Sequence, residues 1–141
     1  MGNLDMTGDE REAFLADLHV GVLSIGREGK GPLSLPIWYR YEPGGPVVLS
    51  MDRASLKARL LGARGRATLT VQTEQPPYRY VMVEGTVTME DHDHDDSMRL
   101  AVRYLGPDLG ARYVQQNPPG DHSVTVHLHP EQWLTVDYGK M

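Results

Sequence analysis

Short apolar segments separated by turn residues run through most of this chain of 141 residues. Valine, leucine and tyrosine are concentrated in these segments, and turns such as Glu42-Pro43-Gly44-Gly45-Pro46 divide them. The pattern lacks the regular alternation of strands and helices that is typical of doubly wound sheets. It therefore predicts one domain, residues 1–141, that is mainly β and forms a closed or partly closed antiparallel barrel.

The turn residues and the apolar periodicity set the expected elements. Strands are expected at 19–25, 33–41, 47–50, 67–72, 79–89, 124–129 and 132–138, with the first three in an antiparallel meander. A capping box at Thr7 and Glu10 predicts a helix over 9–18, and Asp52 is the expected N-cap of a helix over 54–63. Two further helices, 97–104 and 109–116, are expected on either side of Gly106-Pro107.

Composition excludes several classes of function. A formal net charge of -5 leaves no overall positive field, so nucleic acid is not expected as a partner. The absence of cysteine excludes disulfides, thiolate metal sites and cysteine nucleophiles. The first 18 residues contain neither a basic segment nor a long apolar run, so we expect a cytoplasmic protein without a signal peptide or membrane partner.

A polar cluster follows the expected strand at 47–50 and leads into the next helix. Ser55, Lys57 and Arg59 lie at or near the start of that helix. Free backbone N–H groups and the helix dipole favour an anion at such a position, so the segment is a candidate phosphate site. Two simpler readings stay open: the two cations lie on a solvent-exposed helix face, and Ser55 only caps the helix.

The order of these motifs resembles a known family. Ser55-x-Lys57 at a helix start, followed by a strand that contains Arg79 and Val83-Glu84-Gly85, is similar to the pyridoxamine 5'-phosphate oxidase-like split-barrel flavoproteins. The Lys57-Ala58-Arg59 continuation most resembles the branch that uses the deazaflavin coenzyme F420. The oxidases themselves carry glutamine where this chain has Tyr80 and often a basic residue where it has Leu56, and both differences weaken an assignment as an FMN oxidase.

The resemblance implies a mainly β fold, a split β-barrel of six or seven antiparallel strands in a Greek-key-like order with a few short peripheral helices. It also implies a homodimer with the cofactor at the subunit interface, and hydride transfer from F420 to a small unsaturated acceptor. An FMN oxidoreductase and a non-catalytic protein that binds a flavin, deazaflavin or tetrapyrrole are the alternatives. The cofactor contacts implied are Pro36, Ile37 and Trp38 near the ring, Ser50 and Met51 along the polyol, Ser55, Lys57 and Arg59 at the phosphate, and Arg79 and Tyr80 on the barrel wall.

The remaining polar groups predict no second site. A bound hydride carrier supplies its own reactivity, which is consistent with the absence of a recognisable acid–base triad. His92-x-His94 lies in an acidic stretch that we expect to be a solvated loop, and His127-x-His129 lies on a strand. We expect no metal at either pair, although imidazole is an ordinary metal ligand. Trp133 is expected in the core or at a dimer interface.

Overall fold

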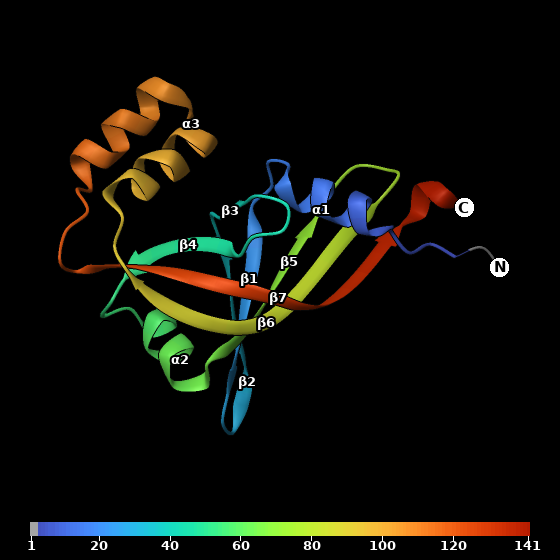
Figure 1. Cartoon of the computed structure of the whole chain (residues 1–141), viewed down its shortest axis with the longest axis horizontal. Helices are drawn as coiled ribbons and strands as arrows, with labels where there is room; N and C mark the ends of the chain where they lie inside the picture. Colours follow the sequence, from blue (N-terminus) through green and yellow to red (C-terminus); the bar gives the residue numbers. More distant parts are fainter. Residues whose placement is uncertain (1–2) are drawn as a thin grey trace.

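The computed structural model describes residues 3–141 and contains one curved, seven-stranded antiparallel sheet (Figure 1). The order of strands across the sheet is β2-β1-β5-β6-β7-β4-β3. The strands are β1 (Gly21–Arg27), β2 (Lys30–Ile37), β3 (Arg40–Tyr41), β4 (Val47–Asp52), β5 (Arg66–Gln72), β6 (Arg79–Asp91) and β7 (Ser123–Asp137). The helices are α1 (Gly8–Ala16), α2 (Leu56–Arg64), α3 (His94–Gln116) and the short 3-10 helix η1 (Tyr138–Lys140).

The core lies on one face of this sheet. Buried and exposed residues alternate along β5, where Ala67, Leu69 and Val71 point inward, and β6 adds Val81 and Val83. Successive side chains of a strand point to opposite faces, so this alternation places one apolar face of each strand on a shared core. The capping box of α1 is confirmed, because the Thr7 hydroxyl accepts from the Glu10 N–H and the Glu10 carboxylate accepts from the Thr7 N–H.

The antiparallel pairings predicted for the first three strands are present, but they do not form one continuous meander. The expected strand at 33–41 is two strands, and its halves β2 and β3 lie at opposite ends of the strand order, paired with β1 and β4. The break falls at Trp38 and Tyr39, which use other partners. Tyr39 is fully buried; its hydroxyl donates to the Leu15 carbonyl at 2.6 Å and its N–H donates to the Tyr104 hydroxyl at 3.1 Å. At Trp38 and Tyr39 the chain therefore passes from one edge strand of the sheet, β2, to the other edge strand, β3.

The two strands predicted at 124–129 and 132–138 are a single strand, β7, which pairs with both β4 and β6. Residues 130–131, which separate the two expected strands, do not form a turn. They lie opposite Glu84 and Gly85, where the register of β6 and β7 shifts by one residue. A Cβ on Gly85 would lie 1.7 Å from the His129 carbonyl oxygen, so only glycine fits. Glu131 accepts the Thr86 N–H at 2.8 Å, which satisfies a backbone donor at the irregularity.

The two helices expected around Gly106-Pro107 are the two arms of α3, which folds back on itself (Figure 1). Gly106 has φ 85° and ψ 170°, a backbone conformation that breaks the helix and that glycine adopts without strain. α3 begins at His94 rather than at Ser97, and its first turn includes Asp96, which is only 5% exposed. The prediction of a solvated acidic loop is therefore wrong at Asp96.

Candidate functional site

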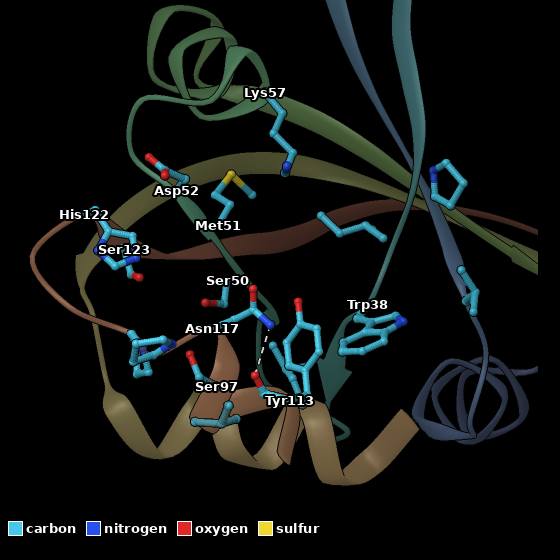
Figure 2. Close-up of a pocket in the computed structure, with 17 residues that line it drawn as sticks. Trp38, Ser50, Met51, Asp52, Lys57, Ser97, Tyr113, Asn117, His122 and Ser123 are labelled. Atoms are coloured by element: carbon cyan, nitrogen blue, oxygen red, sulfur yellow. Dashed lines mark hydrogen bonds between the residues drawn. The ribbon is translucent and has the colours of Figure 1, made fainter. Parts of the chain in front are cut away.

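A cavity of about 490 Å³ lies between the start of α2, the end of β4, the end of β2 and the α3 hairpin (Figure 2). These elements are distant in the sequence, and the curved sheet brings them together. β4 and β7 are neighbours in the sheet, and the end of β2 lines the same cavity as both. The volume lies in the range typical of small-molecule sites. Six residues named from the sequence line the cavity: Pro36, Ile37, Trp38, Ser50, Met51 and Lys57.

Four other candidate residues lie outside the cavity lining. Ser55 precedes α2 and Arg59 is exposed on it. Arg79 borders a separate, shallower pocket, with its guanidinium 5.3 Å from the centre of the Phe14 ring. Tyr80 lies on β6 between Arg79 and the buried Val81, so it points away from the core. A cofactor contact by these residues stays a prediction.

The first turn of α2 forms the polar end of the cavity. Ser55 is the N-cap, and the prediction of Asp52 in that role is wrong. The Ser55 hydroxyl accepts from the Ala58 N–H at 3.2 Å and donates to the Asp52 carbonyl at 2.7 Å. Asp52 instead accepts the Ala54 N–H in the preceding turn, because three residues separate it from the helix.

Lys57 has a free positive charge at this end. Its side chain extends from α2 into the cavity (Figure 2), and no carboxylate oxygen of residues 3–141 lies within 4.0 Å of its Nζ. In the same part of the chain, the backbone N–H groups of Leu56 and Lys57 have no protein acceptor. One mobile cation beside two free N–H donors is suited to an anion such as a phosphate.

Aromatic side chains form the opposite end. The Trp38 ring stacks on Tyr104 with centroids 5.1 Å apart and planes 6° apart, and its centroid is 5.4 Å from that of Tyr113. Tyr104 is held in place, because its hydroxyl donates to the His19 carbonyl at 2.6 Å and accepts the Tyr39 N–H at 3.1 Å. No sequence motif indicated the α3 residues here, since Tyr104 and Tyr113 stand in helical segments without a recognisable binding pattern.

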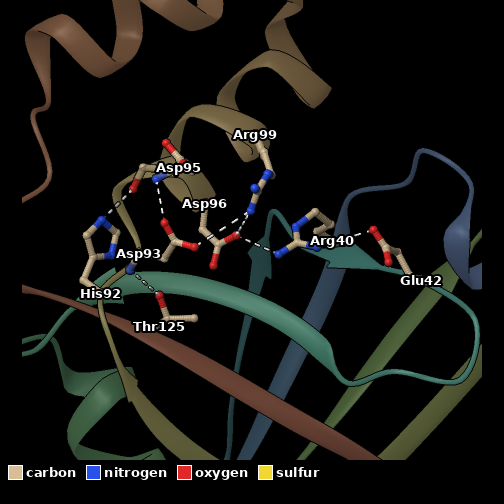
Figure 3. A network of polar contacts seen from close by, with 9 residues as sticks. Arg40, Glu42, His92, Asp93, Asp95, Asp96, Arg99 and Thr125 are labelled. Carbon is tan, nitrogen blue, oxygen red and sulfur yellow. Dashed lines mark hydrogen bonds and ion pairs between the residues drawn. The ribbon is translucent and has the colours of Figure 1, made fainter.

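A buried ion-pair network attaches α3 to the sheet (Figure 3). Asp96 Oδ1 is 2.7 Å from Arg40 Nη2 on β3 and 3.0 Å from Arg99 Nη1. The Asp96 side chain is 7% exposed and that of Arg40 is 24% exposed, so this pair is shielded far better than a surface pair. The network positions the first two turns of α3, from which Ser97 and Leu100 line the cavity.

Histidine 92 adjoins the same turn. Its Nε2 is 3.2 Å from the Ser97 hydroxyl, and burial lowers the pKa of His92 below its ordinary value. On the strands, His127 Nδ1 is 3.8 Å from Glu90 and His129 Nε2 is 2.9 Å from the Thr88 hydroxyl. Among residues 3–141, no three His, Cys, Asp or Glu side chains are grouped so that they could hold a metal ion.

In the part of the chain that the structure describes, no helix is both long and apolar enough to cross a bilayer. Trp133, expected in the core or at an interface, packs partly buried against the core, and the Arg11 guanidinium lies 4.5 Å from its ring centre.

Comparisons with known proteins define the fold. Neither the protein-family models nor the curated protein sequences give a match to this chain. Among solved structures, the conserved hypothetical protein Rv2991 from Mycobacterium tuberculosis is similar, with a TM-score of 0.78 and 21% identity; the match covers 99% of this chain and 90% of that one. An F420 reductase matches with a TM-score of 0.71 and 23% identity, over 87% of this chain and 94% of its own.

A protein of Listeria innocua, provisionally described as a pyridoxamine 5'-phosphate oxidase, matches with a TM-score of 0.68 and 14% identity, over 91% of this chain and 96% of that one. These likenesses extend over nearly the whole of each chain. They confirm the fold expected from the sequence, the split barrel of the pyridoxamine 5'-phosphate oxidase-like proteins.

Proposed function

We propose that this chain, a split barrel of the pyridoxamine 5'-phosphate oxidase-like fold, is an oxidoreductase that binds coenzyme F420 in the cavity and transfers hydride to a small unsaturated acceptor. The observation that carries the proposal is the unpaired Lys57 ammonium, which extends into the cavity beside the free N–H groups of the first turn of α2. The likeness to an F420 reductase supports the choice of cofactor.

The donor set fits this group. A phosphate at the first turn of α2 would receive hydrogen bonds from Lys57 Nζ and from the Leu56 and Lys57 N–H groups, with support from the helix dipole. Ser50 and Met51 lie on β4 between this turn and Trp38, so they would contact the linking polyol. Pro36, Ile37 and Trp38 would then border the ring. A bound deazaflavin supplies two-electron hydride chemistry, and the acceptor takes up its balancing proton from solvent.

Replacing Lys57 with alanine tests the proposal. Loss of a charge-assisted hydrogen bond should weaken F420 binding by about 1.5–3 kcal/mol, roughly 10-fold to 150-fold in Kd. Titration of F420 fluorescence measures this affinity. Lys30→Ala is the control, because Lys30 is exposed at the start of β2 and does not line the cavity. An equal affinity for wild type and Lys57→Ala would remove Lys57 from the phosphate site.

FMN is the second candidate cofactor, since its phosphate suits the same free cation and N–H groups. Tyr80 and Leu56 separate this chain from the oxidases in sequence, and both lie outside the cavity lining. Absorbance spectra of protein expressed with and without a supply of F420 distinguish the two: a yellow flavin spectrum in both preparations would assign FMN. Tight binding of either cofactor without turnover of any acceptor would assign a binding protein.

We also propose that two copies of the chain form a homodimer that completes the cavity. Pro36, Val22, Thr70, Met82 and Leu134 are successive register partners across five strands, so they form one row on the outer face of the sheet. Val22 is 40% exposed and Leu134 is 51% exposed. The row is continuous with the cavity, because Pro36 also lines it.

Light scattering after gel filtration tests the dimer. Leu134→Glu should yield a monomer with weakened cofactor binding, because charges are costly at the apolar centre of an interface. Leu109→Glu is the control, since Leu109 is 56% exposed on α3 and does not belong to the row. A wild-type monomer that binds F420 with full affinity would contradict the dimer and leave the cofactor proposal standing.

A further inference from the structure

The wall that α3 contributes to the cavity differs in chemistry from the wall at α2. Four residues of α3 line the cavity, Ser97, Leu100, Tyr113 and Val114, and none of them carries a formal charge. Within residues 3–141, the lining residues of Asp, Glu, Lys or Arg type are Asp52 and Lys57, which lie across the cavity from Tyr113 (Figure 2). The cavity therefore has one charged end and one uncharged, mainly apolar end.

The apolar end presents rigid aromatic surface. One face of Trp38 is covered by Tyr104, and the Tyr104 hydroxyl is fixed by its contacts to the His19 and Tyr39 backbone. Tyr113 meets Trp38 at an interplanar angle of 53°, which leaves two flat surfaces inclined toward each other. Aromatic faces contact planar rings over a large area at little entropic cost, because their side chains are already ordered.

We infer that Leu100, Tyr113 and Val114 of α3, together with Trp38, form the acceptor subsite, and that this subsite selects uncharged planar ring compounds over anionic ones. The inference rests on the proposed function, in which the cofactor phosphate occupies Lys57. With Lys57 engaged, no other Lys or Arg among residues 3–141 lines the cavity. An anionic acceptor would lose its hydration at the α3 wall without gaining a counter-ion, whereas an uncharged ring loses little.

The subsite can be tested by binding alone, with 2-naphthol as the uncharged probe and 2-naphthoate as its anionic counterpart. Calorimetric titration is carried out on the F420-loaded protein and on the unloaded Lys57→Met variant, in which no lysine competes for the carboxylate. In both we expect 2-naphthol to bind at least tenfold more tightly than 2-naphthoate. Equal affinities, or a preference for the anion, would overturn the inference.

Substitutions in the α3 wall test whether 2-naphthol binds there. Tyr113→Ala should weaken 2-naphthol at least tenfold and leave the Kd for F420 within twofold of wild type. Tyr138→Ala is the matched control, because Tyr138 is 45% exposed and Tyr113 44%, but Tyr138 does not line the cavity. Val114→Lys adds a cation to the α3 wall and should shift the preference toward 2-naphthoate by at least tenfold. Unchanged naphthol binding in Tyr113→Ala would place the acceptor elsewhere.

The two titrations, on the F420-loaded protein and on the Lys57→Met variant, distinguish a failure of this inference from a failure of the proposed function. If F420 does not bind but Lys57→Met still prefers 2-naphthol in a manner that depends on Tyr113, the subsite stands and the cofactor assignment fails. If F420 binds with the expected dependence on Lys57 but neither probe depends on Tyr113, the cofactor assignment stands and the acceptor subsite fails.

Discussion

The two helices that flank the cavity, α2 and α3, are held in place by different kinds of interaction. α2 is bounded by signals within its own sequence: Ser55 caps its start, and Gly65 ends it with φ 69°. α3 is held by residues far away in the chain, through the Asp96 pair with Arg40 and the Arg103 hydrogen bond to the Asp17 carbonyl at 2.7 Å. The α2 end of the cavity is therefore locally encoded, whereas the α3 end depends on tertiary contacts.

Asp96→Ala should have the largest effect on this difference. The substitution removes the carboxylate that pairs with the Arg40 guanidinium, which is largely shielded from solvent. It should therefore lower the free energy of unfolding by about 3 kcal/mol. Urea denaturation measures the loss, and hydrogen exchange should show it concentrated in α3. Glu131→Gln is the control: its pair with Arg66 has side chains 39% and 50% exposed, so the change should cost much less stability than Asp96→Ala. Equal losses in the two variants would contradict the special role of Asp96.

A pair of glycine substitutions sharpens the contrast. A Cβ on Gly110 in α3 would lie 2.8 Å from backbone atoms of Val102, so Gly110→Ala should destabilise the protein by about 1–3 kcal/mol. A Cβ on Gly62 in α2 would meet only the Met89 Cε at 3.8 Å, so Gly62→Ala should stabilise it by about 0.5–1 kcal/mol. Thermal unfolding measures both. If Gly110→Ala does not destabilise the protein, the two arms of α3 are not packed as closely as described; if Gly62→Ala destabilises it, Gly62 is not in the open environment described.

Ser55→Ala tests the local encoding of α2. Loss of the N-cap should cost about 1 kcal/mol of stability, and Ser55→Asn, which keeps a capping oxygen, should retain most of it. Cofactor affinity should fall less in Ser55→Ala than in Lys57→Ala, because the Ser55 hydroxyl already donates to the Asp52 carbonyl. A larger loss of affinity in Ser55→Ala, measured by fluorescence titration, would show that Ser55 contacts the phosphate directly.

Lowering the pH should reduce the free energy of unfolding by less than any of the substitutions above. Burial lowers the pKa of His19 and of His92 below the ordinary 6.5, so the folded state binds fewer protons than the unfolded state below that pH. The free energy of unfolding should therefore fall as pH drops through 6.5 toward 5. Urea titrations across this range, repeated with His19→Asn and His92→Asn, measure the effect; a slope unchanged in both variants would exclude these histidines as its source.

Particular residues show why the sequence predicted one end of the cavity better than the other. Lys57 follows a recognisable strand end and helix start and lines the cavity, while its contact with a cofactor phosphate stays a prediction. Asp52 was assigned the cap that belongs to Ser55, because both are good capping residues and only the path of the turn chooses between them. Whether Arg59, Arg79 and Tyr80 contact the cofactor stays a prediction, since none lines the cavity of a single chain.

The sequence by itself determined the mainly β class, the position of α2 and the break in α3 at Gly106, because periodicity, capping and glycine conformation act over a few residues. Only the tertiary structure decided that Trp38 and Tyr39 divide a predicted strand, that Asp96 is buried, and that Tyr113 and Val114 line the same cavity as Lys57. Those outcomes depend on which strands pair and on which side chains share an ion pair. No pattern of neighbouring residues records such contacts between distant parts of the chain.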